Sequence, residues 1–160
     1  MIKYCYVDTC VLADILKQYN ALYPYQPYKC SNFIGPRMLS EINRAVESMG
    51  YSGMLLTSIF AFIELMNKFN EIFKDTNIRP FSLSTFIKQP PAWITIEDMT
   101  EETSLHLCEV PVLTPGGDPI SGDDAIHIAT ALSRGEKLSF CTTDNRLQQL
   151  SLNNISFITN

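Results

Sequence analysis

Short runs of apolar and β-branched residues alternate with longer segments of helical periodicity along this chain. The strand-like runs cover residues 2–7, 53–57, 93–96, 138–141 and 155–158. The segments with helical spacing cover residues 11–19, 36–49, 59–73, 81–89, 100–108, 125–134 and 146–150. Strands that are separated by helices are joined by crossovers, so this order predicts an α/β/α three-layer fold around a largely parallel sheet of four or five strands.

Polar residues that accept hydrogen bonds stand directly before several of these helical segments. Asp8 precedes the segment 11–19, and Ser58 precedes the long apolar segment 59–73. Side chains of this kind satisfy the free N–H groups of a first helical turn. Residues that favour a helix start therefore stand where the alternating pattern predicts that a strand ends and a helix begins.

Length and composition predict one globular domain that spans residues 1–160. The chain is 46% hydrophobic and 18% charged, which is ordinary for a soluble protein. Asp8 and Asp14 interrupt the place where a signal peptide would need an apolar stretch, and the apolar run 58–66 is too short to span a bilayer. We therefore expect a cytoplasmic protein with no membrane segment, and its five cysteines, none in a CxxC pair, to be reduced thiols.

The formal net charge of −5 limits how this chain could bind nucleic acid. A protein with this balance has no overall positive field to attract a phosphate backbone. Binding to RNA or DNA would have to use a local basic patch or bound cations.

Acidic residues fall at the ends of predicted elements. Asp8 directly follows the first strand, and Asp144 follows the strand 138–141 after two threonines. Asp123 and Asp124 open a helix that is reached through a loop rich in Gly and Pro. Because ligands of open α/β sheets bind beyond the carboxyl ends of the strands, these acids are expected to face one crevice.

Each acid taken singly also has an ordinary explanation. Asp8 could be a helix cap, Asp144 could belong to a turn, and Glu64 lies within an apolar helix one turn from Lys68. Glu64 therefore either pairs with Lys68 at the surface or points inward toward something positive, because a buried unpaired carboxylate costs several kcal/mol. The residue pattern leaves both orientations open.

The conjunction of acids suggests a metal site. Several carboxylates in one crevice would repel one another unless a cation neutralised them. Oxygen ligands without a cluster of His or Cys suit Mg²⁺ or Mn²⁺, and one or two such ions would provide a centre for phosphodiester hydrolysis.

Four short stretches resemble the motifs of PIN-domain ribonucleases of the VapC-like toxin type. They are VDT, IELM, SGDDAIHIATAL and CTTDNRL, which occur in the order of that family and run from Tyr6 to Leu147. The resemblance implies a PIN-like fold and a catalytic metal site at Asp8, Glu64, Asp124 and Asp144. Asp124 is preferred to Asp123 because the acid of the motif directly precedes the alanine.

The same resemblance implies roles for neighbouring residues. Thr9, Asp123 and Thr142 would support the site, and Arg146 and Lys68 would contact the substrate backbone. His127 is interpreted as a residue behind the site or in the core. The tyrosines in or beside the loop 20–35 could stack on single-stranded bases or pack against core or partner surface.

The activity that this resemblance implies is Mg²⁺- or Mn²⁺-dependent endonucleolytic hydrolysis of RNA, leaving 5′-phosphate and 3′-hydroxyl ends. The biological setting it implies is the toxin of a toxin–antitoxin pair, so the expected partners are RNA, an antitoxin protein and, as a further assembly to test, a second copy of the chain.

Two alternatives fit parts of the pattern. A haloacid-dehalogenase-type phosphatase also begins with an aspartate at a strand end, but it uses a second aspartate two residues later, where this chain has Cys10. A catalytically inactive PIN-like binding module would retain the architecture and use the acids as caps. The complete set of four acids favours the nuclease.

Overall fold

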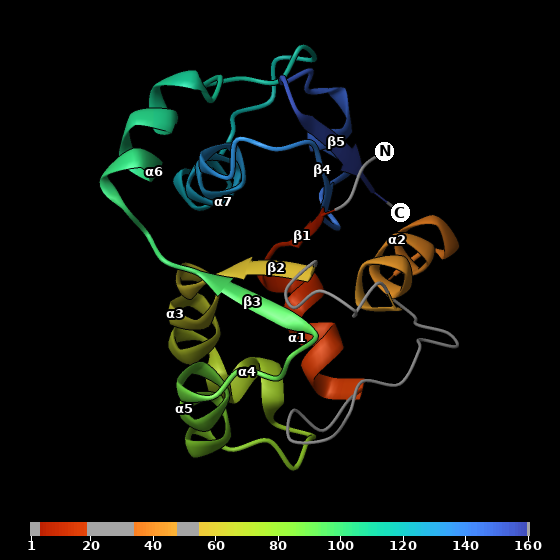
Figure 1. The fold of residues 1–160 in the computed structure, drawn as a ribbon, viewed down its shortest axis with the longest axis vertical. Coiled ribbons are helices and arrows are strands. Elements are labelled where there is room, and N and C mark those ends of the chain that lie inside the picture. Colours follow the sequence, from red (N-terminus) through yellow and green to blue (C-terminus); the bar gives the residue numbers. More distant parts are fainter. Residues whose placement is uncertain (1–3, 19–33, 48–54, 160) are drawn as a thin grey trace.

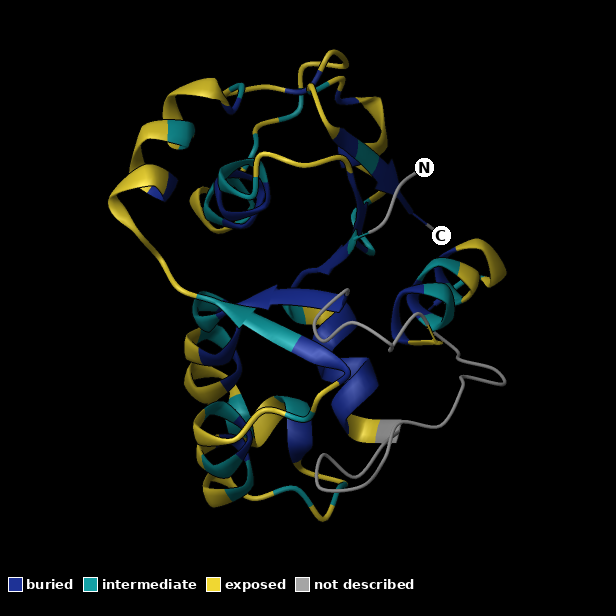
Figure 2. Cartoon of the chain, in the orientation of Figure 1, coloured by how far each residue is buried: buried dark blue, intermediate teal, exposed yellow. Residues whose placement is uncertain are grey.

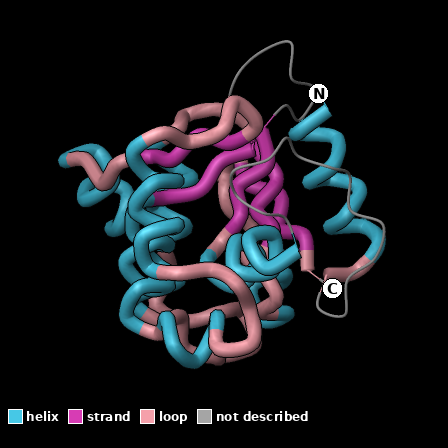
Figure 3. The backbone as a smooth tube through the Cα atoms, turned by 90° about the horizontal axis from the view of Figure 1, so that it is seen from below, coloured by secondary structure: helices cyan, strands magenta, loops and turns pink. Residues whose placement is uncertain are grey.

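The computed structural model describes residues 4–18, 34–47 and 55–159. The first residues of two predicted strands and most of the tyrosine-containing loop 20–35 lie outside the described residues. The described segments contain five strands: β1 (Tyr4–Val7), β2 (Leu55–Ser58), β3 (Ile94–Glu97), β4 (Leu138–Cys141) and β5 (Ile155–Ile158). All neighbouring strands pair in parallel in the order β3-β2-β1-β4-β5, and helices flank the sheet (Figures 1 and 3). The predicted α/β architecture with a parallel sheet is therefore confirmed.

Helices connect the strands in the expected order. The described helices are α1 (Thr9–Gln18), α2 (Pro36–Glu47), α3 (Ile59–Asn67), α4 (Phe69–Phe73), α5 (Pro80–Lys88), α6 (Glu101–His106) and α7 (Gly122–Ser133). Two short 3₁₀ helices complete them, η1 (Leu107–Glu109) and η2 (Asn145–Gln149).

Several predicted boundaries need correction. The segment 59–73 was expected to be one helix, but it divides into α3 and α4 at Lys68, whose φ of −111° and ψ of 22° leave the helical region. The late helix begins at Gly122 with Ser121 as its N-cap, so Asp123 and Asp124 lie in its first turn. The last predicted helix is a 3₁₀ helix, which suits so short a segment.

The two faces of the sheet carry separate hydrophobic cores. Cys5 and Val7 of β1 pack with residues of α1, α2, α3 and α5 on one face. Tyr6, which lies between them in the strand, packs with Ile128 of α7 and with Phe140 on the other face. This alternation follows from the two-residue repeat of a strand, and it buries both faces of the sheet (Figure 2).

Among the described helices, none is both long enough and apolar enough to cross a membrane. The longest are α2 and α7, each with 12 residues. A membrane-spanning helix needs about 20 apolar residues.

The core on the α7 face generates a stability prediction. Phe140 is 1% exposed, and its ring lies 5.0 Å from that of Tyr6 and 5.2 Å from that of Phe157. We expect Phe140→Ala to cost about 3–5 kcal/mol of unfolding free energy, because truncation leaves a cavity between the two rings. Phe81→Ala is the matched control, since Phe81 is 80% exposed and its truncation should change stability by less than about 0.5 kcal/mol. Urea unfolding of both variants measures the difference, and equal losses would contradict this core assignment.

Candidate active site

The strand order reverses between β1 and β4. From β1 the chain continues to β2 and β3 on one side, whereas β4 and β5 lie on the other. In open parallel sheets this reversal opens a crevice beyond the strand ends, where ligands bind. Asp8 follows β1, and Asp144 follows β4 after Thr142 and Thr143, so the sequence places two acids at this point.

Asp8 is held at the crevice by its backbone and its side chain. Its N–H donates to the carbonyl of Cys141 at 3.3 Å, which extends the β1–β4 pairing by one residue. Its Oδ1 accepts from the N–H of Val11 at 3.1 Å and so caps α1, and its carboxylate also bonds the hydroxyl of Thr142. The partners that bond this side chain directly are neutral groups.

Burial dominates the electrostatics of Asp8. Only 7% of the residue is exposed, and this burial raises the pKa of its carboxyl group. The bonds from Thr142 and Val11 and the charge of His127 oppose the rise, whereas the charge of Asp124 adds to it. A buried carboxylate with neutral direct partners is a group that a cation would stabilise.

Thr142 joins the two strand-end acids. Its Oγ1 accepts from the N–H of Asp144 at 3.1 Å, and its hydroxyl bonds Asp8. The carboxylate of Asp144 is in turn occupied by Arg146. The guanidinium Nε lies 2.9 Å from Oδ1 and 3.1 Å from Oδ2, and the Arg146 N–H donates to Oδ1 at 3.0 Å.

The Arg146 contact changes the expectation for both residues. The side-chain hydrogen bond from Arg146 lowers the pKa of Asp144, whereas burial of the carboxylate opposes this change. The guanidinium of Arg146, which the sequence predicts to contact substrate, binds Asp144 in this structure. The two roles compete for the same side chain.

Asp123 and Asp124 lie in the first turn of α7, where Ser121 Oγ accepts from the N–H of Asp124 at 3.1 Å. Asp124 is half-buried and Asp123 is exposed. Burial and the charges of Asp8, Glu64 and Asp124 raise the pKa of the nearby Cys10 thiol, although a hydrogen bond with Thr143 opposes them. Three of the four predicted ligands are therefore close enough to Cys10 to raise the pKa of its thiol.

Glu64 points toward α1 and α7. Its Oε2 accepts from the hydroxyl of Thr9 and lies 2.7 Å from Nε2 of His127. Burial raises the pKa of Glu64, but the bonds from His127 and Thr9 and the charges of His127 and Lys68 bring it below its ordinary value. The nitrogen that bonds Glu64 among the described residues is Nε2 of His127, so the alternative of a surface pair with Lys68 is set aside.

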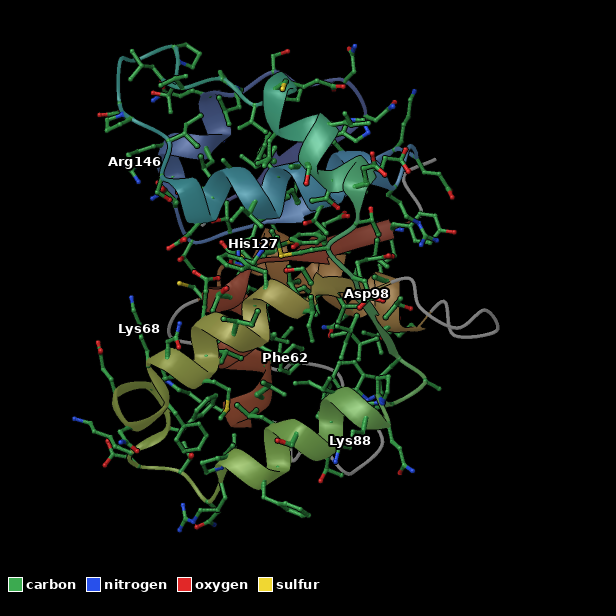
Figure 4. All side chains as sticks on the ribbon, turned by 90° about the vertical axis from the view of Figure 1, so that its left-hand side faces the viewer. Phe62, Lys68, Lys88, Asp98, His127 and Arg146 are labelled. Atoms are coloured by element: carbon green, nitrogen blue, oxygen red, sulfur yellow. The ribbon has the colours of Figure 1, made fainter. Side chains whose placement is uncertain are left out.

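A cavity of about 610 Å³ lies beside these groups. Its lining includes Thr9, Glu64 and Asp123 together with Lys17 and Lys68. Figure 4 shows His127 between α7 and α3, with Arg146 and Lys68 lying toward the same side of the molecule. The volume falls within the range of ordinary ligand pockets.

No protein-family model matches the sequence, and no curated protein matches it either. Solved structures do match the fold. A chain of DNA-bound VapBC from Salmonella typhimurium superposes with a TM-score of 0.56 at 15% identity, covering 99% of this chain and 98% of that one. VapBC2 from Rickettsia felis, bound to a fragment of promoter DNA, gives 0.57 at 12% identity with the same coverage.

Both are toxin–antitoxin complexes in which VapC is a PIN domain. The fold of this chain is PIN-like. The match extends over nearly the full length of both chains, so it confirms the architecture that the sequence motifs implied.

The oxygen donors at this edge of the PIN-like fold are carboxylates and hydroxyls, which are the groups that a hard divalent cation prefers. Among them, Asp8 is buried beside Asp124. The positions of these donors do not form a complete coordination site. Within residues 4–18, 34–47 and 55–159, no three His, Cys, Asp or Glu side chains are placed to hold one metal ion. Glu64 and Asp144 are bound instead by His127 and Arg146.

Sequence reasoning placed His127 behind the site or in the core, but it did not predict the contacts of His127 or of Tyr6. His127 was given no contact, and Tyr6 was treated only as part of a strand, yet Tyr6 Oη lies 2.8 Å from Nδ1 of His127. A histidine inside the apolar segment AIHIATAL was the available signal, because a buried imidazole needs polar partners. The partners themselves depend on how α7 packs, which the sequence pattern does not encode.

The buried charge of Asp8 predicts that Asp8→Asn stabilises the metal-free protein. Asparagine keeps the Oδ1 acceptor for Val11 and removes the charge. Because the folded-state pKa of Asp8 is raised, the protein is favoured while Asp8 is protonated and loses that stability as the pH rises through the folded pKa. With chelator at about pH 8, the melting temperature should rise by roughly 2–4 °C, the shift that ~1 kcal/mol produces in a domain of this size.

The gain should shrink as the pH is lowered from about 8 to about 4, because protonation of Asp8 in the wild type removes the same buried charge. Thermal melts at both pH values measure it. An Asp8→Asn variant that is less stable than wild type at pH 8 would show that the buried charge is already compensated within the protein.

Proposed function

We propose that this chain is a metal-dependent endoribonuclease that hydrolyses RNA phosphodiester bonds. The observation that carries the proposal is the buried carboxylate of Asp8 at the reversal of strand order, beside Asp124 and joined through Thr142 to Asp144. A carboxylate in this position is destabilised by its burial, and binding a divalent cation would relieve that cost. The PIN-like fold supports the same proposal.

In this proposal Asp8, Glu64, Asp124 and Asp144 hold one or two Mg²⁺ or Mn²⁺ ions. When bound, such an ion lowers the pKa of water and stabilises charge on the attacking and leaving oxygens. The contribution of the chain is to orient the acids. The Val11 N–H and the Thr142 hydroxyl fix Asp8, and Thr9 fixes Glu64.

In this proposal, the basic side chains of Lys68 and Arg146 bind the phosphate backbone of the substrate. Lys68 lines the cavity together with Glu64, so a phosphate that reaches Glu64 could meet this ammonium group. Arg146 must leave Asp144 before it can contact a phosphate. Local cations of this kind are what a chain with a net charge of −5 requires in order to bind RNA.

A protein antitoxin is the partner that we propose. The two matched structures are VapBC complexes bound to DNA. Co-expression with a small protein encoded beside this chain should suppress RNA cleavage, and purification should recover the two together. A neighbouring protein that neither binds nor inhibits would remove the support for a toxin role, and a second copy of this chain is then the assembly to measure.

A catalytically inactive binding module is the second candidate. The observation that favours it is that the carboxylates of Glu64 and Asp144 already bind side chains of the protein, those of His127 and Arg146. If those contacts persist in solution, the acids serve to stabilise the fold. Metal affinity separates the two candidates.

The nuclease proposal predicts that labelled single-stranded RNA is cut in Mn²⁺ and left intact with chelator. Asp124→Asn should slow cleavage by roughly 100-fold or more, because losing a carboxylate ligand weakens charge stabilisation in the transition state. It should also abolish the rise in melting temperature that Mn²⁺ gives the wild type by binding the folded state. Gel analysis of RNA and thermal melts measure the two effects.

The exposed Asp98 provides the matched control, and Asp98→Asn should behave as wild type in both assays. Asp123→Asn tests the choice between neighbouring acids and should retain more activity than Asp124→Asn. Cleavage that survives chelation would overturn the metal requirement, and absence of both cleavage and Mn²⁺ stabilisation would favour the binding module. Turnover of p-nitrophenyl phosphate would instead point to the phosphatase.

A further inference from the structure

His127 occupies a position in which every polar atom of its ring has a partner. The residue is 3% exposed and lies within α7. Its Nδ1 lies 2.8 Å from Tyr6 Oη, and its Nε2 lies 2.7 Å from Glu64 Oε2 and 2.9 Å from Thr9 Oγ1. The imidazole therefore connects the buried face of β1 with the carboxylate that lines the cavity.

The neighbouring groups determine which nitrogen of His127 carries the proton. Ser58 Oγ accepts from the N–H of Ala61, which leaves its own proton for Tyr6 Oη. Burial raises the pKa of Tyr6 well above its ordinary value, although the bond from Ser58 opposes this, so the phenol keeps its proton. Tyr6 then donates to Nδ1, and a proton on Nε2 faces Glu64.

Aromatic packing fixes the plane of this ring. The Tyr6 and Phe60 rings approach that of His127 edge-on, with centroids 6.0 Å and 5.4 Å away. A ring that packs against Phe60 and Tyr6 and also bonds the Tyr6 hydroxyl cannot turn away from Glu64 without losing several contacts at once. The orientation of Nε2 is therefore a property of the folded core.

Both fixed donors converge on the same oxygen of Glu64. Thr9 and His127 bond Oε2, and Oε1 has no hydrogen-bond partner among the described residues. Glu64 also lines the cavity. We propose that His127, set by Tyr6, is a positioning residue that holds Oε2 of Glu64 and thereby keeps Oε1 available to whatever binds at the site. This role rests on the proposed nuclease function.

Two substitutions of His127 distinguish a role in core packing from a role in positioning Glu64. His127→Gln and His127→Asn form a matched pair of buried amides that differ by one methylene. The amide nitrogen of glutamine can reach the place of Nε2 and donate to Glu64, whereas asparagine reaches only the Nδ1 side. If His127 only filled space in the core, neither amide donor would be needed, and the Gln and Asn variants would not differ because of how far their amides reach.

Steady-state cleavage of RNA in Mn²⁺ tests the role. We expect His127→Gln to retain most of the wild-type kcat, and His127→Asn and Tyr6→Phe to lose about 10–100-fold, as the loss of a group that orients a ligand does elsewhere. RNA affinity measured with chelator should be the same in all variants, since Glu64 is affected and the phosphate contacts are not. Equal kcat values for the Gln and Asn variants, whether both low or both wild-type, would overturn the role.

A second measurement does not depend on activity. Nitrogen-15 NMR of the imidazole in the wild type, without metal, reports whether Nε2 carries a proton, and Tyr6→Phe should change the tautomer balance. A His127 ring whose Nε2 lacks a proton overturns the proposal. If the NMR result is as expected and the wild type cuts no RNA, then the proposed function has failed while the contact with Glu64 stands.

Discussion

The parallel pairing of β1 with β4 is the interaction on which the candidate site depends. Strands of four residues end abruptly, and the residues that follow them must lie at the same edge of the sheet. The Asp8 N–H continues the ladder to Cys141, and the Thr142 side chain then bridges Asp8 and Asp144. Two acids that are far apart in the sequence are thereby held beside one crevice without a covalent link.

The acids at this crevice differ in how their charge is compensated. Asp144 binds the Arg146 guanidinium, and Glu64 binds His127 and Thr9, so the pKa of each is lowered. Asp8 is buried among neutral donors, and its pKa is raised. Of these three acids, Asp8 carries the charge that the protein compensates least, and a cation would stabilise it most.

The sequence predicted the parts of the site that depend on element order. Asp8 and Asp144 could be placed because the carboxyl end of a short apolar strand can be recognised in the sequence. The alternation of strands and helices in addition implies parallel pairing. Asp123 and Asp124 could be placed near a helix start, although the cap proved to be Ser121. These inferences need only local pattern and chain connectivity.

The parts that the sequence did not predict depend on packing between distant elements. The partner of Glu64 is set by where α7 presents His127 to α3 and β1, and the i,i+4 spacing suggested Lys68 instead. The break at Lys68 falls within a segment whose apolar spacing predicts one continuous helix. The contact between Arg146 and Asp144 is local, but whether it yields to a cation is a competition that no sequence pattern decides.

Anomalous diffraction from crystals of the protein grown with Mn²⁺ would locate the metal relative to Asp8 and Asp144. We predict an anomalous peak beyond the carboxyl ends of β1 and β4. Carboxylate oxygens of Asp8 and Asp124 should lie about 2.0–2.2 Å from it, the distance at which small divalent cations bind oxygen. Density for Mn²⁺ elsewhere, or an ordered crevice in which Arg146 still binds Asp144 and no peak lies at Asp8, would contradict this prediction.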